Sequence, residues 1–177
     1  MALTAVMLSA GARSARAQKP LSLAGYLGIG NTAGGNFSDR VKWTYGADLD
    51  LRVAQIGSTR FVVGTEAAKL GGEGDYVTVV NPGGISLTGT FPNVTYLVAT
   101  AGVRHYFTSG ESLEIGAGYG SVKEERGPTY PGLWWTAGVS KRFTDALSLV
   151  IGIRSIQWTH AGNTLHAYPI TFGLRLD

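Results

Sequence analysis

The feature that most constrains this chain is an alternation of side-chain character that recurs from Leu21 to Leu176. In residues 40–53, alternate positions are apolar, and the positions between them are polar, charged or glycine. The apolar set is Trp43, Tyr45, Ala47, Leu49, Leu51 and Val53, and the polar set is Lys42, Thr44, Gly46, Asp48, Asp50 and Arg52. Successive side chains of a β-strand point to opposite faces, whereas a helix repeats every 3.6 residues. The pattern therefore predicts a strand with one apolar and one polar face.

The same division recurs in seven further segments, so the sequence predicts eight strands. These segments are 21–31, 60–69, 95–107, 112–122, 132–143, 146–158 and 167–176. The connections alternate between tight turns, at 57–59, 108–111 and 144–145, and longer loops, at 32–39, 70–93, 123–131 and 160–166. Each tight turn joins two strands into a β-hairpin. All tight turns and both chain ends are therefore expected at one end of the sheet, with the long loops at the other.

An internal repeat supports the predicted register. The tripeptide Ala101-Gly102-Val103 recurs 36 residues later as Ala137-Gly138-Val139. Further matches at the same offset are Phe107 with Phe143, Leu113 with Leu149, and Ile115-Gly116 with Ile151-Gly152. The repeating unit is a strand, a short turn and a strand. We expect these hairpins to share one closed sheet.

The positions of the glycines indicate which face of each strand points into the barrel and which faces its surroundings. The chain has 26 glycines in 177 residues, about twice the usual share of roughly 7%, and they gather on the charged face. A row of glycine facing water would only weaken the strands. In the narrow lumen of an eight-stranded barrel, however, small residues make room for a few long charged ones. The long aliphatic side chains then face lipid, which predicts an all-β, eight-stranded antiparallel up-and-down transmembrane β-barrel.

The chain resembles the small eight-stranded outer-membrane barrels of the OmpA/OmpX type. The resemblance covers Leu21 to Leu176 and rests on the repeated Ala-Gly-Val…Phe-Thr…Leu-x-Ile-Gly units and the closing Thr-Phe-Gly-Leu-Arg-Leu strand. It implies the outer membrane of a Gram-negative-type envelope, with outer-membrane lipid and the barrel-assembly machinery as partners. Such barrels usually finish on an aromatic residue that this machinery reads, whereas the last aromatic residue here is Phe172.

The domain organisation follows from the two ends of this pattern. Residues 1–17 are predicted to be a signal peptide, because an apolar stretch ends in Ala15-Arg16-Ala17, although no basic segment precedes it. An ordinary buried helix is the alternative. Residues 18–177 are predicted to form the outer-membrane β-barrel domain. Without the first 17 residues, the 15 Lys and Arg residues become 13 against 12 acidic residues. Because the chain has no basic patch with interleaved aromatic residues, nucleic-acid binding has no support.

Charged residues on the glycine face form a predicted lumen network. Its members are Lys42, Asp48, Asp50, Arg52, Arg60, Glu66, Arg104, Glu114, Arg142, Arg154 and Arg175. Since buried charges must be paired, we interpret them as salt bridges that plug the barrel. A gated pore or proton path is the alternative. Aromatic residues near the strand ends are expected to form interface girdles, namely Trp43, Phe107, Tyr119, Trp134, Trp135 and Phe143.

No catalytic residues, cofactor or metal site are predicted. Cysteine is absent, and the three histidines are scattered. Some eight-stranded barrels are lipid A deacylases, which place a serine two residues after a histidine. In this chain, the residue two positions after His160 is Gly162, and the residue two positions after His166 is Tyr168. Thr159 or Ser155 would have to replace the nucleophile, so an outer-leaflet lipid A-modifying enzyme is an alternative only.

A second alternative is a soluble, exported, lipocalin-like barrel that holds an apolar ligand. This alternative requires the opposite orientation of the two strand faces, with Leu49, Leu51, Leu149 and Ile151 directed into the barrel.

The function predicted from the sequence is a structural or surface-interaction role. Loops 70–93 and 123–131 are available to bind an extracellular ligand. The first contains two short apolar segments, 76–80 and 85–89, around Asn81-Pro82-Gly83-Gly84, which indicates a hairpin. This hairpin can extend the neighbouring strands, form a binding protrusion, or add two spanning strands for a total of ten. Five-residue arms are too short for the last option, because a spanning strand needs roughly 9–11 residues.

Overall fold

The fold was obtained from a computed structural model, which describes residues 20–34, 37–71, 76–80, 86–90, 93–125, 127–160 and 162–177. The expected signal peptide, residues 1–17, lies outside the described residues, as do the side chains of Lys42 and His160.

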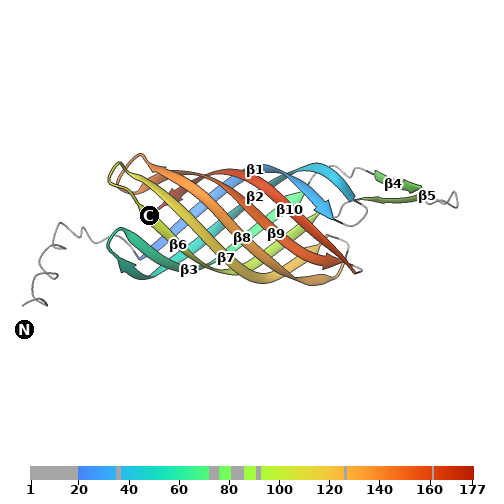
Figure 1. Ribbon diagram of the computed structural model, residues 1–177, viewed down its shortest axis with the longest axis horizontal. Helices are drawn as coiled ribbons and strands as arrows, with labels where there is room; N and C mark the ends of the chain where they lie inside the picture. The colour runs from blue at the N-terminus through green and yellow to red at the C-terminus, as the bar shows by residue number, and fades with distance from the viewer. Residues whose placement is uncertain are drawn as a thin grey trace, which may run out of the picture.

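Eight long antiparallel strands form one closed barrel (Figure 1). They are β1 (Leu21–Gly34), β2 (Phe37–Ile56), β3 (Thr59–Gly71), β6 (Val94–Tyr106), β7 (Glu111–Glu124), β8 (Thr129–Arg142), β9 (Leu147–His160) and β10 (Asn163–Leu176). Each strand pairs with its neighbours in the chain, and β1 also pairs with β10. Closure removes every sheet edge, so the strands satisfy one another's backbone hydrogen bonds, as a lipid environment requires. The predicted eight-stranded up-and-down barrel is confirmed.

The remaining two strands, β4 (Tyr76–Val80) and β5 (Ser86–Thr90), pair only with each other among the described residues. They form a hairpin that projects beyond one end of the barrel (Figure 1). The alternative of ten spanning strands is therefore wrong. Five-residue strands span too little of a bilayer to join the barrel wall.

The two ends of the barrel differ as the loop lengths predict. Tight turns and the C-terminus gather at one end, and the β4–β5 hairpin marks the other (Figure 1). Gly57 in the β2–β3 turn and Gly110 in the β6–β7 turn have φ values of 57° and 87°. Side chains rarely adopt this left-handed conformation, so glycine suits both turns. Several strands are longer on the loop side than predicted, because pairing continues past the clearly alternating segments.

The outer face of the barrel is apolar and exposed. Leu27 is 68% exposed, and Leu49, Leu51 and Ile151 also lie on the outside. These last three side chains contradict the lipocalin-like alternative, which requires them inside. A closed band of exposed aliphatic side chains is the surface that lipid covers in transmembrane barrels. No helix in the described part of the chain is long and apolar enough to cross a membrane.

The lumen is divided along its length into a charged half and an apolar half. On the loop side, large apolar side chains replace the small and charged residues that the sequence predicted. Members of this apolar cluster are Leu70, Val94, Val98, Val122, Ile156, Trp158 and Leu165. The indole of Trp158 donates a hydrogen bond to Glu124 Oε1 over 3.1 Å, so its single polar group is satisfied. This end of the barrel interior is packed like the core of a soluble protein.

Candidate functional site: the lumen

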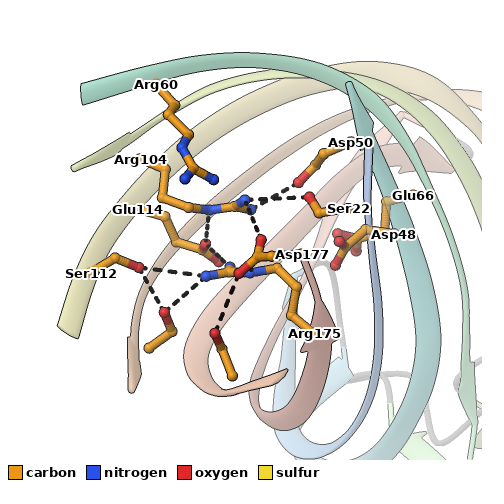
Figure 2. Close-up of polar contacts among 12 residues, drawn as sticks. Ser22, Asp48, Asp50, Arg60, Glu66, Arg104, Ser112, Glu114, Arg175 and Asp177 are labelled. Carbon is orange, nitrogen blue, oxygen red and sulfur yellow. Dashed lines mark hydrogen bonds and ion pairs between the residues drawn. The ribbon is translucent and has the colours of Figure 1, made fainter. Parts of the chain in front are cut away.

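Two clusters of charged side chains fill the rest of the lumen. The first lies toward the tight turns and centres on Arg104 of β6 (Figure 2). Arg104 Nη2 lies 2.9 Å from Asp50 Oδ2, and its Nε lies 2.9 Å from Glu114 Oε2. Arg175 Nη1 reaches the same Glu114 oxygen over 2.6 Å. Four strands, β2, β6, β7 and β10, thus contribute to one network of alternating charge.

Serines and the last residue complete this Arg104 cluster. Arg175 Nη2 donates to Ser140 Oγ over 2.8 Å, and Ser140 is 2.6 Å from Ser112 Oγ. Asp177 Oδ1 lies 3.4 Å from Arg175 Nε. Each guanidinium therefore has several acceptors, which offsets the cost of removing its charge from water.

The second cluster centres on Glu66 of β3, whose side chain is 1% exposed. Its Oε1 accepts hydrogen bonds from Tyr26 Oη (2.6 Å), Tyr96 Oη (2.9 Å) and Trp134 Nε1 (3.0 Å). Its Oε2 accepts one from Arg154 Nε over 3.2 Å. Three neutral donors and one cation therefore hold a single buried carboxylate.

Arg154 of β9 connects this Glu66 cluster to the opposite wall. Its Nη2 lies 3.0 Å from Asp48 Oδ2, and its Nη1 donates to Thr171 Oγ1 over 2.5 Å. The guanidinium carbon also lies 3.8 Å from the centre of the Tyr26 ring, a cation–π contact. Gly46 of β2 makes room for Tyr26, because a Cβ there would lie 2.6 Å from the Tyr26 hydroxyl.

The structure separates the residues of the predicted charge network. Seven of them meet in the two clusters: Asp48, Asp50, Glu66, Arg104, Glu114, Arg154 and Arg175. Arg60 and Arg142 instead lie at the tight-turn end and contact the Tyr106 ring. Arg52 donates to Gln55 Oε1 at the same end. For Arg60 and Arg142, the expectation that they join one network with the acids is therefore not met by the contacts of the described residues.

The structure agrees with the predicted aromatic girdle at all but one of its residues. Trp43, Phe107, Tyr119, Trp135 and Phe143 are exposed on the outer surface. Trp134 is buried in the lumen and donates to Glu66. Because adjacent side chains of a strand point to opposite faces, Trp134 and Trp135 cannot both face lipid. Placing both in the girdle was wrong for this reason.

Sequence reasoning missed several residues that contribute to the lumen. Tyr26, Tyr96 and Trp158 are buried inside the barrel, and Asp177 joins the Arg104 cluster. The first three occupy positions in step with the glycine face, so the alternation itself contained the signal. Asp177 also keeps the step of two from Arg175, so alternation extended by one residue past Leu176 would have placed it on the lumen face.

Between the two clusters, the described side chains leave a cavity of about 40 Å³. Glu66 and Arg154 line one side, and Arg104, Glu114 and Arg175 line the other. A space of this size holds a few water molecules and no larger solute. Within the described part of the chain, no group of three or more His, Asp or Glu side chains is arranged to hold a metal ion.

The described histidines are engaged outside the lumen clusters. His105 Nδ1 lies 2.8 Å from Thr59 Oγ1 near the tight turns, and the His166 ring stacks on Tyr168 with ring centres 5.7 Å apart. Nucleophilic catalysis needs a hydroxyl within hydrogen-bond reach of its base. Thr59 and His105 meet that distance, but they lie at the end opposite the rim where the deacylase hypothesis needs its base.

Comparison with solved structures identifies the architecture. Neisserial surface protein A (NspA) aligns with a TM-score of 0.62 at 14% identity, over 89% of this chain and 97% of that chain. The chain has the fold of the small outer-membrane β-barrels. This confirms the predicted OmpA/OmpX-type resemblance at the level of the fold. An outer membrane of the Gram-negative type is the setting of this fold, and the apolar outer face of the barrel matches it.

Two further solved structures align over most of the chain at lower similarity. Ail of Yersinia pestis gives a TM-score of 0.44 at 11% identity, over 89% of this chain and 99% of that chain. The N-terminal β-barrel domain of Pseudomonas aeruginosa OprF gives 0.41 at 12% identity, over 88% and 98%. No protein-family model and no curated protein sequence matches the chain.

Proposed function

We propose that this protein is a closed outer-membrane barrel with a structural or surface-interaction role, and that its long loops carry the interaction. The observation that carries the proposal is a series of three packed side-chain clusters in the described part of the lumen. The Arg104 cluster, the Glu66 cluster and the apolar cluster follow one another from the tight turns to the loops. A cavity of about 40 Å³ between the two charged clusters gives no path for a solute. We therefore favour a plugged barrel over a gated pore.

The loop side supplies the surface for an interaction. The β4–β5 hairpin extends beyond the barrel, and a two-stranded hairpin offers strand edges to which an extended partner segment can add. The bases of loops 70–93 and 123–131 are joined, because Asn93 Nδ2 donates to Glu125 Oε2 over 2.8 Å and Glu125 N donates to Asn93 O over 2.9 Å. We propose that the two loops form one binding surface for an extracellular ligand.

The first test is conductance of the purified full chain in planar lipid bilayers. A plugged barrel is expected to insert without stepwise current. The comparison variant is Glu66→Ala/Arg154→Ala, which removes the central ion pair; because the Arg104 cluster and the apolar cluster remain, it should also insert without stepwise current. Stepwise current from the unaltered protein would contradict the plug.

The surface role is tested on whole cells. A variant in which residues 76–90 are replaced by a short glycine-serine turn is compared with the full chain for adhesion to host-derived or abiotic surfaces. Both proteins should fractionate with the outer membrane and give a compact gel band that shifts on boiling. Loss of adhesion in the folded variant supports the proposal, whereas equal adhesion contradicts it.

A further inference from the structure

A bowl of about 240 Å³ opens at the tight-turn end of the barrel, opposite the long loops. The β2–β3 and β6–β7 turns form part of its wall, and Arg60, Arg142 and Tyr106 line it. We call this site the turn-side bowl. It is separate from the two lumen clusters and from the loop surface.

Two arginines of the turn-side bowl converge on one aromatic ring. The guanidinium carbon of Arg60 lies 4.1 Å from the centre of the Tyr106 ring, and that of Arg142 lies 5.6 Å from it. Arg60 Nη1 also donates to Tyr106 Oη over 3.0 Å. Tyr106 therefore holds both cations at the surface of the same hollow.

Arg60 is incompletely satisfied despite its burial. The residue is 6% exposed, and its Nε is a buried donor without a hydrogen-bond acceptor. Figure 2 shows Arg60 beside the Arg104 cluster but outside the contacts that join it. Buried polar groups in folded proteins nearly always have a partner, so an unpaired guanidinium nitrogen indicates an acceptor that the chain does not supply.

The lining of the bowl contains these two arginines and no acidic residue. Among the described residues, no acidic oxygen lies within 4.0 Å of the guanidinium of Arg60 or Arg142. Asp177, an acid of the neighbouring cluster, forms its ion pairs with Arg104 and Arg175, and its charge acts on Arg60 only from a longer distance. Arg104 lies directly opposite Arg60 in the β3–β6 register, but its own charge is paired with Asp50 and Glu114. The bowl is thus a polar hollow with an excess of positive charge.

We propose that the turn-side bowl binds a phosphate group, with Arg60 and Arg142 as its principal ligands. A guanidinium presents its N–H donors in a planar fork that matches two oxygens of a phosphate, and it remains charged at any physiological pH. The hollow is large enough for a phosphate with a short organic substituent. The headgroup of a phospholipid on the tight-turn side and a soluble phosphate ester share this chemistry.

The test measures binding of inorganic phosphate and glycerol 3-phosphate to the folded full chain in a phosphate-free maltoside detergent, by titration calorimetry. Hydrogen bonds to charged groups contribute roughly 1.5–3 kcal/mol, which corresponds to about a 10- to 100-fold change in Kd. Arg142→Gln and Arg60→Gln are each expected to weaken binding at least tenfold. Arg142→Lys, which keeps the charge but loses the fork, should recover only part of the affinity.

Lys141→Gln is the matched control. Lys141 precedes Arg142 but points to the outer face, where it pairs with Glu111, so this variant removes one charge at the same end and no side chain that lines the bowl. It should bind phosphate within twofold of the unaltered protein. Heat-modifiable gel migration verifies that each variant is folded. Because Arg142 is only half-buried, its variant keeps the test valid if Arg60→Gln fails to fold.

A second arm distinguishes the two phosphate sources. The titration is repeated in vesicles of a phosphate-free galactolipid, and then with phosphatidylglycerol added. Loss of phosphate binding on addition of the phospholipid assigns the site to a headgroup, and unchanged binding assigns it to a soluble ester. The proposal is overturned if neither probe binds, if the arginine variants bind like the unaltered protein, or if Lys141→Gln weakens binding as much as they do.

Discussion

Replacing Glu66 with glutamine should destabilise the barrel by about 3 kcal/mol. Removing one partner of a buried ion pair typically costs about 3–5 kcal/mol, because the remaining charge is left uncompensated. In Glu66→Gln, the amide oxygen can still accept from Tyr26, Tyr96 and Trp134. The amide NH₂ then faces Arg154 Nε, which loses its acceptor at 3.2 Å and retains only Asp48 as an ionic partner. This retention of three of the four hydrogen bonds places the expected loss at the lower end of the range.

The assay is equilibrium unfolding by urea in lipid vesicles, followed by tryptophan fluorescence. Trp134 donates directly to Glu66, so the emission of the folded state should also change in the variant. Glu66→Ala removes all four hydrogen bonds and should cost more than Glu66→Gln. Glu111→Gln is the control, because Glu111 pairs with Lys141 at the exposed end of β7, where solvent screens an ion pair and it contributes little to stability.

A loss of stability for Glu66→Gln no larger than that for Glu111→Gln would refute the reasoning. It would mean that water reaches the Glu66 cluster and solvates Arg154 when its partner is removed. The lumen would then be hydrated, and the plugged barrel would fail with it.

Three further substitutions test other parts of the fold by the same unfolding assay. Ile115→Arg, at a side chain 59% exposed on the outer face, should cost about 2–4 kcal/mol if the site lies near the bilayer midplane; an unchanged stability would contradict a lipid-facing surface. Gly46→Val should abolish the compact folded gel band, because its Cβ would press against the Tyr26 hydroxyl and Ala68; a variant that folds normally would show that Tyr26 has room to move. Trp158→Ala should cost about 3–5 kcal/mol, as expected for removing a fully buried aromatic side chain; a loss below 1 kcal/mol would mean that the loop-side lumen is not tightly packed.

Alternation predicted the barrel because it is a local property. A period of two assigns a face to every side chain of a strand, and the apolar face of 40–53 needs only its own sequence to be recognised. The same rule places Tyr26 with Ser22 and Ala24, and Trp134 opposite Trp135, as the structure does. The error for Trp134 came from preferring an aromatic residue at the interface over its position in the strand.

Which charged side chains pair with one another could not be predicted from the sequence, for a different reason. Arg154 had several acids on the predicted lumen face as partners, and its selection of Glu66 and Asp48 depends on the curvature and stagger of the closed sheet. The apolar half of the lumen was not predicted, because apolar residues such as Val98 and Ile156 can face either the lipid or a packed lumen. Their place becomes evident only when neighbouring strands bring them together with Leu70 and Val122.

The contacts of Arg154 also bear on the order in which the barrel can be built. Its partners Glu66 and Asp48 precede it by 88 and 106 residues, and they lie on strands that are not its sheet neighbours. No single hairpin contains both sides of these ion pairs, so they arise late, when the β1–β10 seam brings the two walls face to face. Until then an open sheet holds unmatched charges on its concave surface. Sealing the seam and neutralising the interior are therefore coupled events, and a chain that lacks its last strands would retain a penalty that the complete barrel does not.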